Sequence, residues 1–69
     1  MMAQLRVNGV EEEITARTVA ELLGALGVDP AARFLAVAVN GTVVRRSEWL
    51  SRPLSPGDNV EIVRPFSGG

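Results

Sequence analysis

Alternation of apolar and polar residues predicts two strands at the start of the chain. Residues 3–7 and 10–14 each alternate with a period of two, as half-buried strands do. Between them stands Asn8-Gly9, a dipeptide that accepts the positive φ angles of a two-residue type I′ turn. Residues 3–14 are therefore predicted to form a β-hairpin.

The pattern then changes to that of a helix. Thr18 and Glu21 have capping-box spacing, in which the threonine hydroxyl accepts from the Glu21 amide and the glutamate reaches back to the Thr18 amide. Gly27 stands where a left-handed C-terminal cap would end the helix. An apolar stripe at helical spacing lies between them, formed by Val19, Leu22, Leu23 and Leu26. A helix this short needs a sheet to pack against.

The second half returns to strands. Residues 34–39 and 42–45 flank a second Asn-Gly pair, Asn40-Gly41, and predict another hairpin. Residues 46–50 are expected to be irregular or a single helical turn, 55–58 a tight turn, and 59–64 a last strand. The order ββαβββ predicts an α+β fold, with one helix packed on one face of a mixed sheet. We expect residues 1–65 to form this domain and residues 66–69 to project as a flexible C-terminal arm.

Composition narrows the function. The 69 residues include no histidine, cysteine, lysine or tyrosine, so the common general base, the thiolate nucleophile and the imidazole and thiolate metal ligands are missing. Seven arginines against eight acidic residues give a net charge of −1, which argues against nucleic-acid binding. No apolar run has the length of a signal peptide or a membrane span. We expect a cytoplasmic protein that is not an enzyme and has no metal site of its own.

The C-terminal Gly68-Gly69 is the feature that composition does not explain. Two residues without side chains can pass through a channel too narrow for other residues, and they place a terminal carboxylate at the tip of the arm. This geometry suits a carboxylate that another protein processes. Taken alone, however, a terminal Gly-Gly is more often only a frayed end.

The surrounding sequence resembles the ThiS/MoaD group of sulfur carriers, which share the ubiquitin-like β-grasp fold. The resemblance rests on residues 37–41 (VAVNG), 44–49 (VRRSEW), 54–63 (LSPGDNVEIV) and the final Gly-Gly, and the helix start at 18–23 (TVAELL) fits as well. The second segment and the VEIV strand look more like the thiamine-pathway branch. The ending, 65–69 (PFSGG), looks somewhat like the molybdopterin branch.

The resemblance implies a co-substrate. A ThiF-like adenylyltransferase would use ATP and Mg²⁺ to adenylate the Gly69 carboxylate, and a sulfur donor such as a cysteine desulfurase would displace AMP to leave a thiocarboxylate. Gly68 and Ser67 would thread the partner's channel. In the thiamine branch the sulfur acceptor is thiazole synthase (ThiG-like). No cofactor would stay bound to the carrier itself.

Four residues are candidates for contact with these partners. Phe66 lies beyond the last strand and beside the arm, where an exposed aromatic residue has little structural purpose. Ala36, Ala38 and Val63 would make the outer sheet face shallow and apolar, as a docking surface would be, or would only fill tight strand packing. The single tryptophan, Trp49, is expected to fill the core instead.

Three alternatives stay open at this point. A molybdopterin-synthase small subunit would use the same chemistry in another pathway. A TGS-like binding module, which residues 39–41 and 56–58 also resemble, would need no free Gly-Gly end. A ubiquitin-like modifier would form amide bonds to lysines of target proteins. The terminal glycines, the length and the order of the motifs favour the sulfur carrier.

Overall fold

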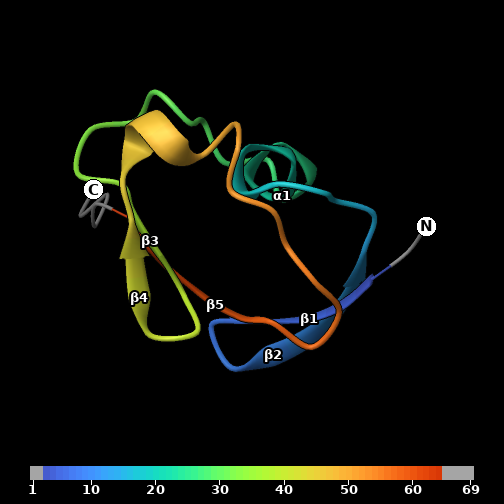
Figure 1. Cartoon of the computed structure of the whole chain (residues 1–69). Helices are drawn as coiled ribbons and strands as arrows, with labels where there is room; N and C mark the ends of the chain where they lie inside the picture. Colours follow the sequence, from blue (N-terminus) through green and yellow to red (C-terminus); the bar gives the residue numbers. More distant parts are fainter. Residues whose placement is uncertain (1–2, 65–69) are drawn as a thin grey trace, which may run out of the picture.

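The computed structural model describes residues 3–64 and consists of one helix lying across one face of a five-stranded sheet (Figure 1). The strands are β1 (Ala3–Val7), β2 (Val10–Ile14), β3 (Ala36–Val39), β4 (Thr42–Val44) and β5 (Asn59–Val63). The α-helix is α1 (Val19–Ala25), and a single 3₁₀ turn, η1, covers Arg46–Glu48. The predicted α+β class and the ββαβββ order are confirmed.

The sheet has the order β2-β1-β5-β3-β4, which places the last strand in the middle. β5 runs parallel to β1 and antiparallel to β3, so the sheet is mixed as predicted. The two hairpins, β1-β2 and β3-β4, therefore flank the strand that leads to the C-terminus. This arrangement holds β5 from both sides.

Both hairpins close on the predicted Asn-Gly turns. Asn8 and Gly9 have φ angles of 49° and 83°, and Asn40 and Gly41 have 52° and 83°. Two consecutive positive φ angles are what a type I′ turn requires. The turn length fixes the register, because Val7 pairs with Val10 and Val39 with Thr42.

The helix is capped at both ends, with one difference from the prediction. The Thr18 hydroxyl accepts from the Glu21 amide at 3.2 Å, as expected. The Glu21 carboxylate, however, accepts from the amide of Arg17 at 2.9 Å and not from that of Thr18. Gly27, at φ 73°, ends the helix, and the Val28 amide donates to the Leu23 carbonyl at 2.9 Å, as in a Schellman motif.

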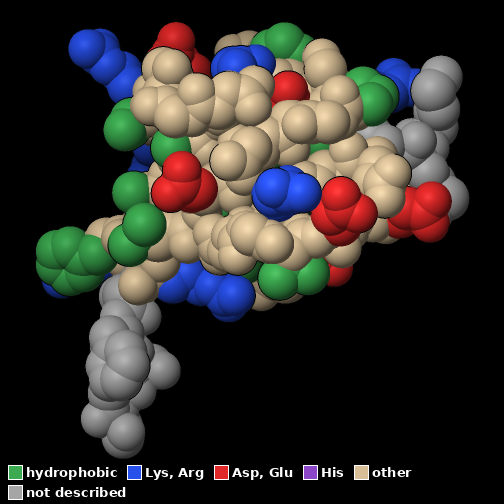
Figure 2. Space-filling model, turned by 90° about the horizontal axis from the view of Figure 1, so that it is seen from below, with side chains coloured by type: hydrophobic (Ala, Val, Ile, Leu, Met, Phe, Trp, Pro, Cys, Tyr) green, Lys and Arg blue, Asp and Glu red, His purple; other side chains and the backbone are tan. Residues whose placement is uncertain are grey.

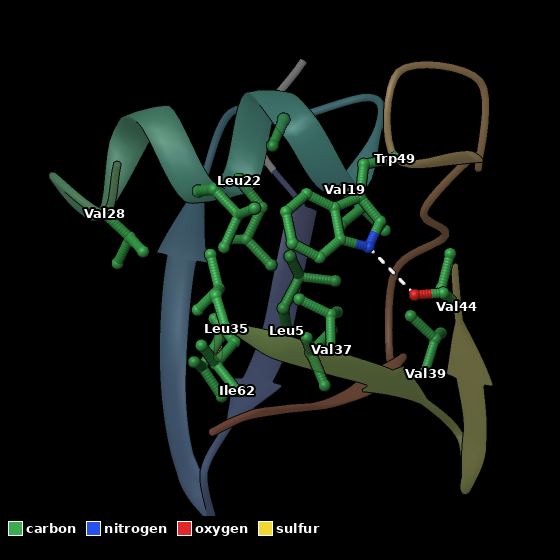
Figure 3. Close-up of a cluster of buried hydrophobic side chains, with 14 residues drawn as sticks. Leu5, Val19, Leu22, Val28, Leu35, Val37, Val39, Val44, Trp49 and Ile62 are labelled. Carbon is green, nitrogen blue, oxygen red and sulfur yellow. Dashed lines mark hydrogen bonds between the residues drawn. The ribbon is translucent and has the colours of Figure 1, made fainter. Parts of the chain in front are cut away.

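The core fills the space between α1 and the sheet (Figure 3). Three residues of the predicted helix stripe are buried in it, whereas Leu26 is half-buried. Trp49 is 3% exposed and donates its indole N–H to the Val44 carbonyl at 2.9 Å, so the tryptophan is a core residue as predicted. The buried hydrophobic residues are Leu5, Val7, Ala16, Val19, Leu22, Leu23, Val28, Leu35, Val37, Val39, Val44, Trp49, Val60 and Ile62.

Three predicted strands are longer than the observed ones, and β5 differs least, because it ends at Val63 and not at Arg64. β4 ends at Val44, and Arg45 precedes the turn η1 instead of extending the strand. β3 begins at Ala36, because Phe34 has a positive φ of 62°, which no strand residue adopts. The segment before Ala36 is therefore a turn that connects α1 to the sheet.

Candidate functional site

The outer face of the sheet, opposite α1, is divided into two halves. Over β1 and β2 its side chains are polar or charged: Gln4 lies opposite Glu13, and Arg6 lies opposite Glu11. The Arg6 guanidinium and the Glu11 carboxylate are 3.6 Å apart. Such a surface is well hydrated and gains little from contact with an apolar partner.

The other half of the face, over β3, β4 and β5, is mostly apolar, although the exposed Glu61 of β5 lies on it. Ala38 lies opposite Val43 on one side and Glu61 on the other, and Ala36 lies opposite Val63. Val43 is 72% exposed and Val63 is 62% exposed. In Figure 2, which shows the molecule from below, green side chains gather mostly along the left edge, whereas blue and red side chains are spread over the whole view. We call Ala36, Ala38, Val43 and Val63 the outer apolar patch.

The structure thus brings together three of the residues that the sequence singled out. Ala36, Ala38 and Val63 share one face, and that face is not covered by another element of the described chain. Sequence reasoning missed Val43, although the signal was present: a two-residue turn at Asn40-Gly41 pairs Ala38 with Val43. A docking role for these residues stays a prediction, which the geometry permits.

The side chain of Asn8 fixes the far end of β5. Its Oδ1 accepts from the Ile62 amide at 2.8 Å, and its Nδ2 donates to the Ile62 carbonyl at 3.3 Å. β1 itself ends at Val7, so the Asn8 side chain continues the pairing with β5 beyond the strand. Ile62, the neighbour of the patch residue Val63 in the chain, is therefore held in place by Asn8 of the first hairpin.

Asn40 acts in the same way at the near end of β5. Its Oδ1 accepts from the Asn59 amide at 2.9 Å, and its Nδ2 donates to the Asp58 carboxylate at 3.0 Å. The sequence predicted both asparagines as turn residues only. The structure gives each of them a second role as a support for the central strand.

The predicted arm lies beyond this strand. Arg64 is the last described residue, and Phe66, Ser67, Gly68 and Gly69 lie outside the described residues. Their assigned roles therefore stay predictions, as does the division into a domain of residues 1–65 and an arm of 66–69. What the described part supplies is a rigid central strand that leads to them and an apolar patch beside it.

Within residues 3–64, no three Asp or Glu side chains gather closely enough to hold a metal ion. No helix in the same part of the chain has the length and apolarity needed to cross a membrane. Every buried side-chain nitrogen or oxygen there has a hydrogen-bond partner.

Known proteins resemble this chain in sequence and in fold. The family model described as "ThiS family" matches residues 5–69. Two solved structures of a thiamine biosynthesis protein, ThiS, from Geobacter metallireducens are similar: both are 33% identical and cover 96% of this chain. The crystal structure has a TM-score of 0.77 with 99% of its chain covered, and the solution structure 0.76 with 87% covered.

A curated relative is similar over part of its length. It is named thiazole synthase, comes from Paramagnetospirillum magneticum, and is 40% identical over 67 residues, or 96% of this chain. The chain spans only about a fifth of that protein, since 20% of the relative is covered.

Proposed function

This chain belongs to the ThiS family, and we propose that it is a sulfur carrier for the thiazole ring of thiamine. The family match and the likeness to solved ThiS structures support the thiamine pathway over the molybdopterin pathway. The protein acts as a co-substrate: its C-terminal carboxylate is the group that reacts, and other proteins supply the catalytic residues.

The proposed chemistry has two steps at Gly69. A carboxylate oxygen first attacks the α-phosphorus of ATP, so that pyrophosphate leaves and an acyl-adenylate forms. A sulfur nucleophile then attacks the acyl carbon and AMP leaves: hydrosulfide gives the thiocarboxylate directly, whereas a persulfide donor gives an acyl disulfide, which a thiol reduces to the thiocarboxylate. The first step is necessary because a carboxylate resists nucleophiles, whereas the mixed anhydride has a good leaving group. The Mg²⁺ and ATP belong to the adenylating partner.

Three partners follow from this chemistry: a ThiF-like adenylyltransferase, a sulfur donor such as a cysteine desulfurase, and a sulfur-accepting thiazole synthase. The relative from Paramagnetospirillum magneticum supports the last one, because a segment similar to this chain forms part of a protein named thiazole synthase. Joining a carrier to its acceptor raises their effective concentration. The use of ATP places the proposed reaction in the cytoplasm.

The observation that carries the proposal is the position of the outer apolar patch. It lies on β3, β4 and the end of β5, and β5 leads to Gly68-Gly69 in the sequence. A partner that acts on the Gly69 carboxylate has to approach this end of the sheet. The patch offers it an apolar surface, which is the usual centre of a protein interface.

The test uses the absence of cysteine. The chain is incubated with its adenylating enzyme, ATP, Mg²⁺ and a sulfur donor, then treated with a thiol-alkylating reagent and analysed by intact and fragment mass spectrometry. We expect one adduct, at Gly69, because the chain has no side-chain thiol. The control variant carries one extra residue after Gly69 and should give no adduct. An extended chain that is still alkylated at its end would rule out a free Gly69 carboxylate as the acceptor.

A further inference from the structure

Phe34 is the described residue whose conformation the fold explains least. Its backbone φ is +62°, and its side chain is 80% exposed. The other non-glycine residues with positive φ in residues 3–64 are Asn8 and Asn40, which belong to the residue type that tolerates this region. A bulky aromatic residue there is a genuine outlier, and strain of this kind is concentrated at functional sites.

The segment that carries Phe34 is fixed to the core. The Arg46 guanidinium donates to the carbonyl oxygens of Pro30 and Ala32, the latter at 2.7 Å. The same guanidinium lies over the Trp49 ring, 4.7 Å from its centroid. Trp49 is itself buried and hydrogen-bonded to β4. The turn that carries Phe34 is therefore braced, because Arg46 joins it to the core. A braced turn loses little conformational entropy when it binds a partner.

Phe34 also lies at the end of the sheet from which the reactive carboxylate extends. It precedes β3 by two residues, and the first residue of β3, Ala36, lies opposite Val63. Arg64 follows directly, and five residues separate it from the end of the chain. Fully extended, five residues reach about 17 Å. An enzyme whose active site holds the Gly69 carboxylate must therefore approach this end of the sheet closely.

We propose that Phe34 is a preformed aromatic anchor that inserts into an apolar pocket of the adenylating enzyme and extends the outer apolar patch on that side. The inference rests on the proposed function. Exposed aromatic rings become the strongest contributors to binding when a partner buries them. Within residues 3–64, no burial of the ring offsets the backbone strain of Phe34. We therefore expect the ring to be buried in the complex with the adenylating enzyme.

The test measures the KM for this chain in the adenylation reaction. The rate is monitored by the release of pyrophosphate. Phe34→Gly removes the ring and accepts positive φ without steric cost, so the melting temperature should not fall. We expect its KM to rise about tenfold or more with kcat unchanged, as for an interface anchor. Phe34→Leu keeps an apolar side chain and should stay within about threefold of the unaltered chain. Leu50→Ala is the matched control, since Leu50 is 84% exposed and belongs neither to the outer apolar patch nor to the turn that carries Phe34.

Each other outcome overturns the proposal. If the unaltered chain releases pyrophosphate but Phe34→Gly has the same KM, the anchor is wrong and the proposed function stands. If Leu50→Ala raises KM as much, the effect is one of general surface hydrophobicity. If sedimentation shows a dimer that Phe34→Gly dissociates, the pocket belongs to a second copy. If the unaltered chain is not adenylated at all, the proposed function fails and the anchor fails with it.

Discussion

The hairpins β1-β2 and β3-β4 have the same type of turn, but their outer faces differ in polarity. Both close on Asn-Gly, both place buried residues toward α1, and both flank β5. Over the first hairpin the outer face carries Gln4, Arg6, Glu11 and Glu13, whereas over the second it carries Ala36, Ala38 and Val43. Toward α1, the first hairpin buries Leu5 and Val7 and the second buries Val37, Val39 and Val44, because the core requires apolar residues there.

The outer faces are free of that requirement, so their difference points to function. Folding alone would permit a charged outer face everywhere, since solvent covers it, and a charged face protects a sheet from association. The apolar residues are confined to the half of the face that includes the end of β5. We infer that this half is kept apolar for a partner and that the charged half is the ordinary solvent surface.

The largest expected effect comes from placing a charge on each half in turn. Ala38→Arg and Gln4→Arg both set an arginine directly opposite a glutamate, Glu61 or Glu13, so the sheet accommodates each charge pair equally. We expect Ala38→Arg to raise the adenylation KM about 30-fold or more, because a residue at an interface centre contributes 2 kcal/mol or more.

Gln4→Arg should change the same KM less than about twofold, as exposed charges outside an interface do. Circular dichroism melting would show whether both variants keep the fold. Equal KM values for the two variants would mean that the division of the outer face has no functional meaning.

The next largest effect is on the free energy of unfolding, and it differs between Asn8 and Asn40. Replacing each by glycine keeps the positive φ and removes only the side-chain hydrogen bonds. Asn8→Gly should lower the free energy of unfolding by about 1.5 kcal/mol, because two partly buried bonds to Ile62 are lost. Asn40→Gly should lower it by about half as much, because its bonds to Asn59 and Asp58 are exposed. Urea denaturation gives both values; a larger loss for Asn40→Gly would contradict this ranking.

These asparagines also show how far the sequence could predict the structure. Turn position is a local property, so Asn-Gly predicted both hairpins. The hydrogen bonds from Asn8 to Ile62 join residues 54 apart in the chain, and no local pattern reveals them. Ala36, Ala38 and Val63 were predicted as a set because strand alternation assigns faces.

Phe34 shows where local reasoning fails. As an aromatic residue before an apolar alternation it was predicted to open the strand, but it has a helical, left-handed φ. Its turn is braced by Arg46, twelve residues later in the sequence, through contacts to Pro30 and Ala32. Tertiary contacts of this kind outweigh β propensity.

A smaller effect is expected at the exposed valines of the two hairpins. Val43 lies in the outer apolar patch, whereas Val10 lies opposite Val7 at the start of β2. Threonine keeps the β-branched shape, so each Val→Thr variant should change the unfolding free energy by less than about 0.5 kcal/mol. Only Val43→Thr should raise the adenylation KM, by about fourfold, as expected for one buried methyl group at about 0.8 kcal/mol. A rise for Val10→Thr instead would place the partner on the other hairpin.

The smallest effect is expected for the ion pair on the charged half. Arg6 and Glu11 have side chains 56% and 63% exposed, so water screens their attraction. Glu11→Gln should lower the unfolding free energy by less than about 0.5 kcal/mol. Even this difference should disappear in 1 M salt, where the screening length is about 3 Å. The adenylation KM should stay unchanged, because the pair lies outside the outer apolar patch. A different result would be a KM that rises for Glu11→Gln at low salt and recovers at high salt. It would show that the partner also contacts the charged half, so that the whole outer face of the sheet docks.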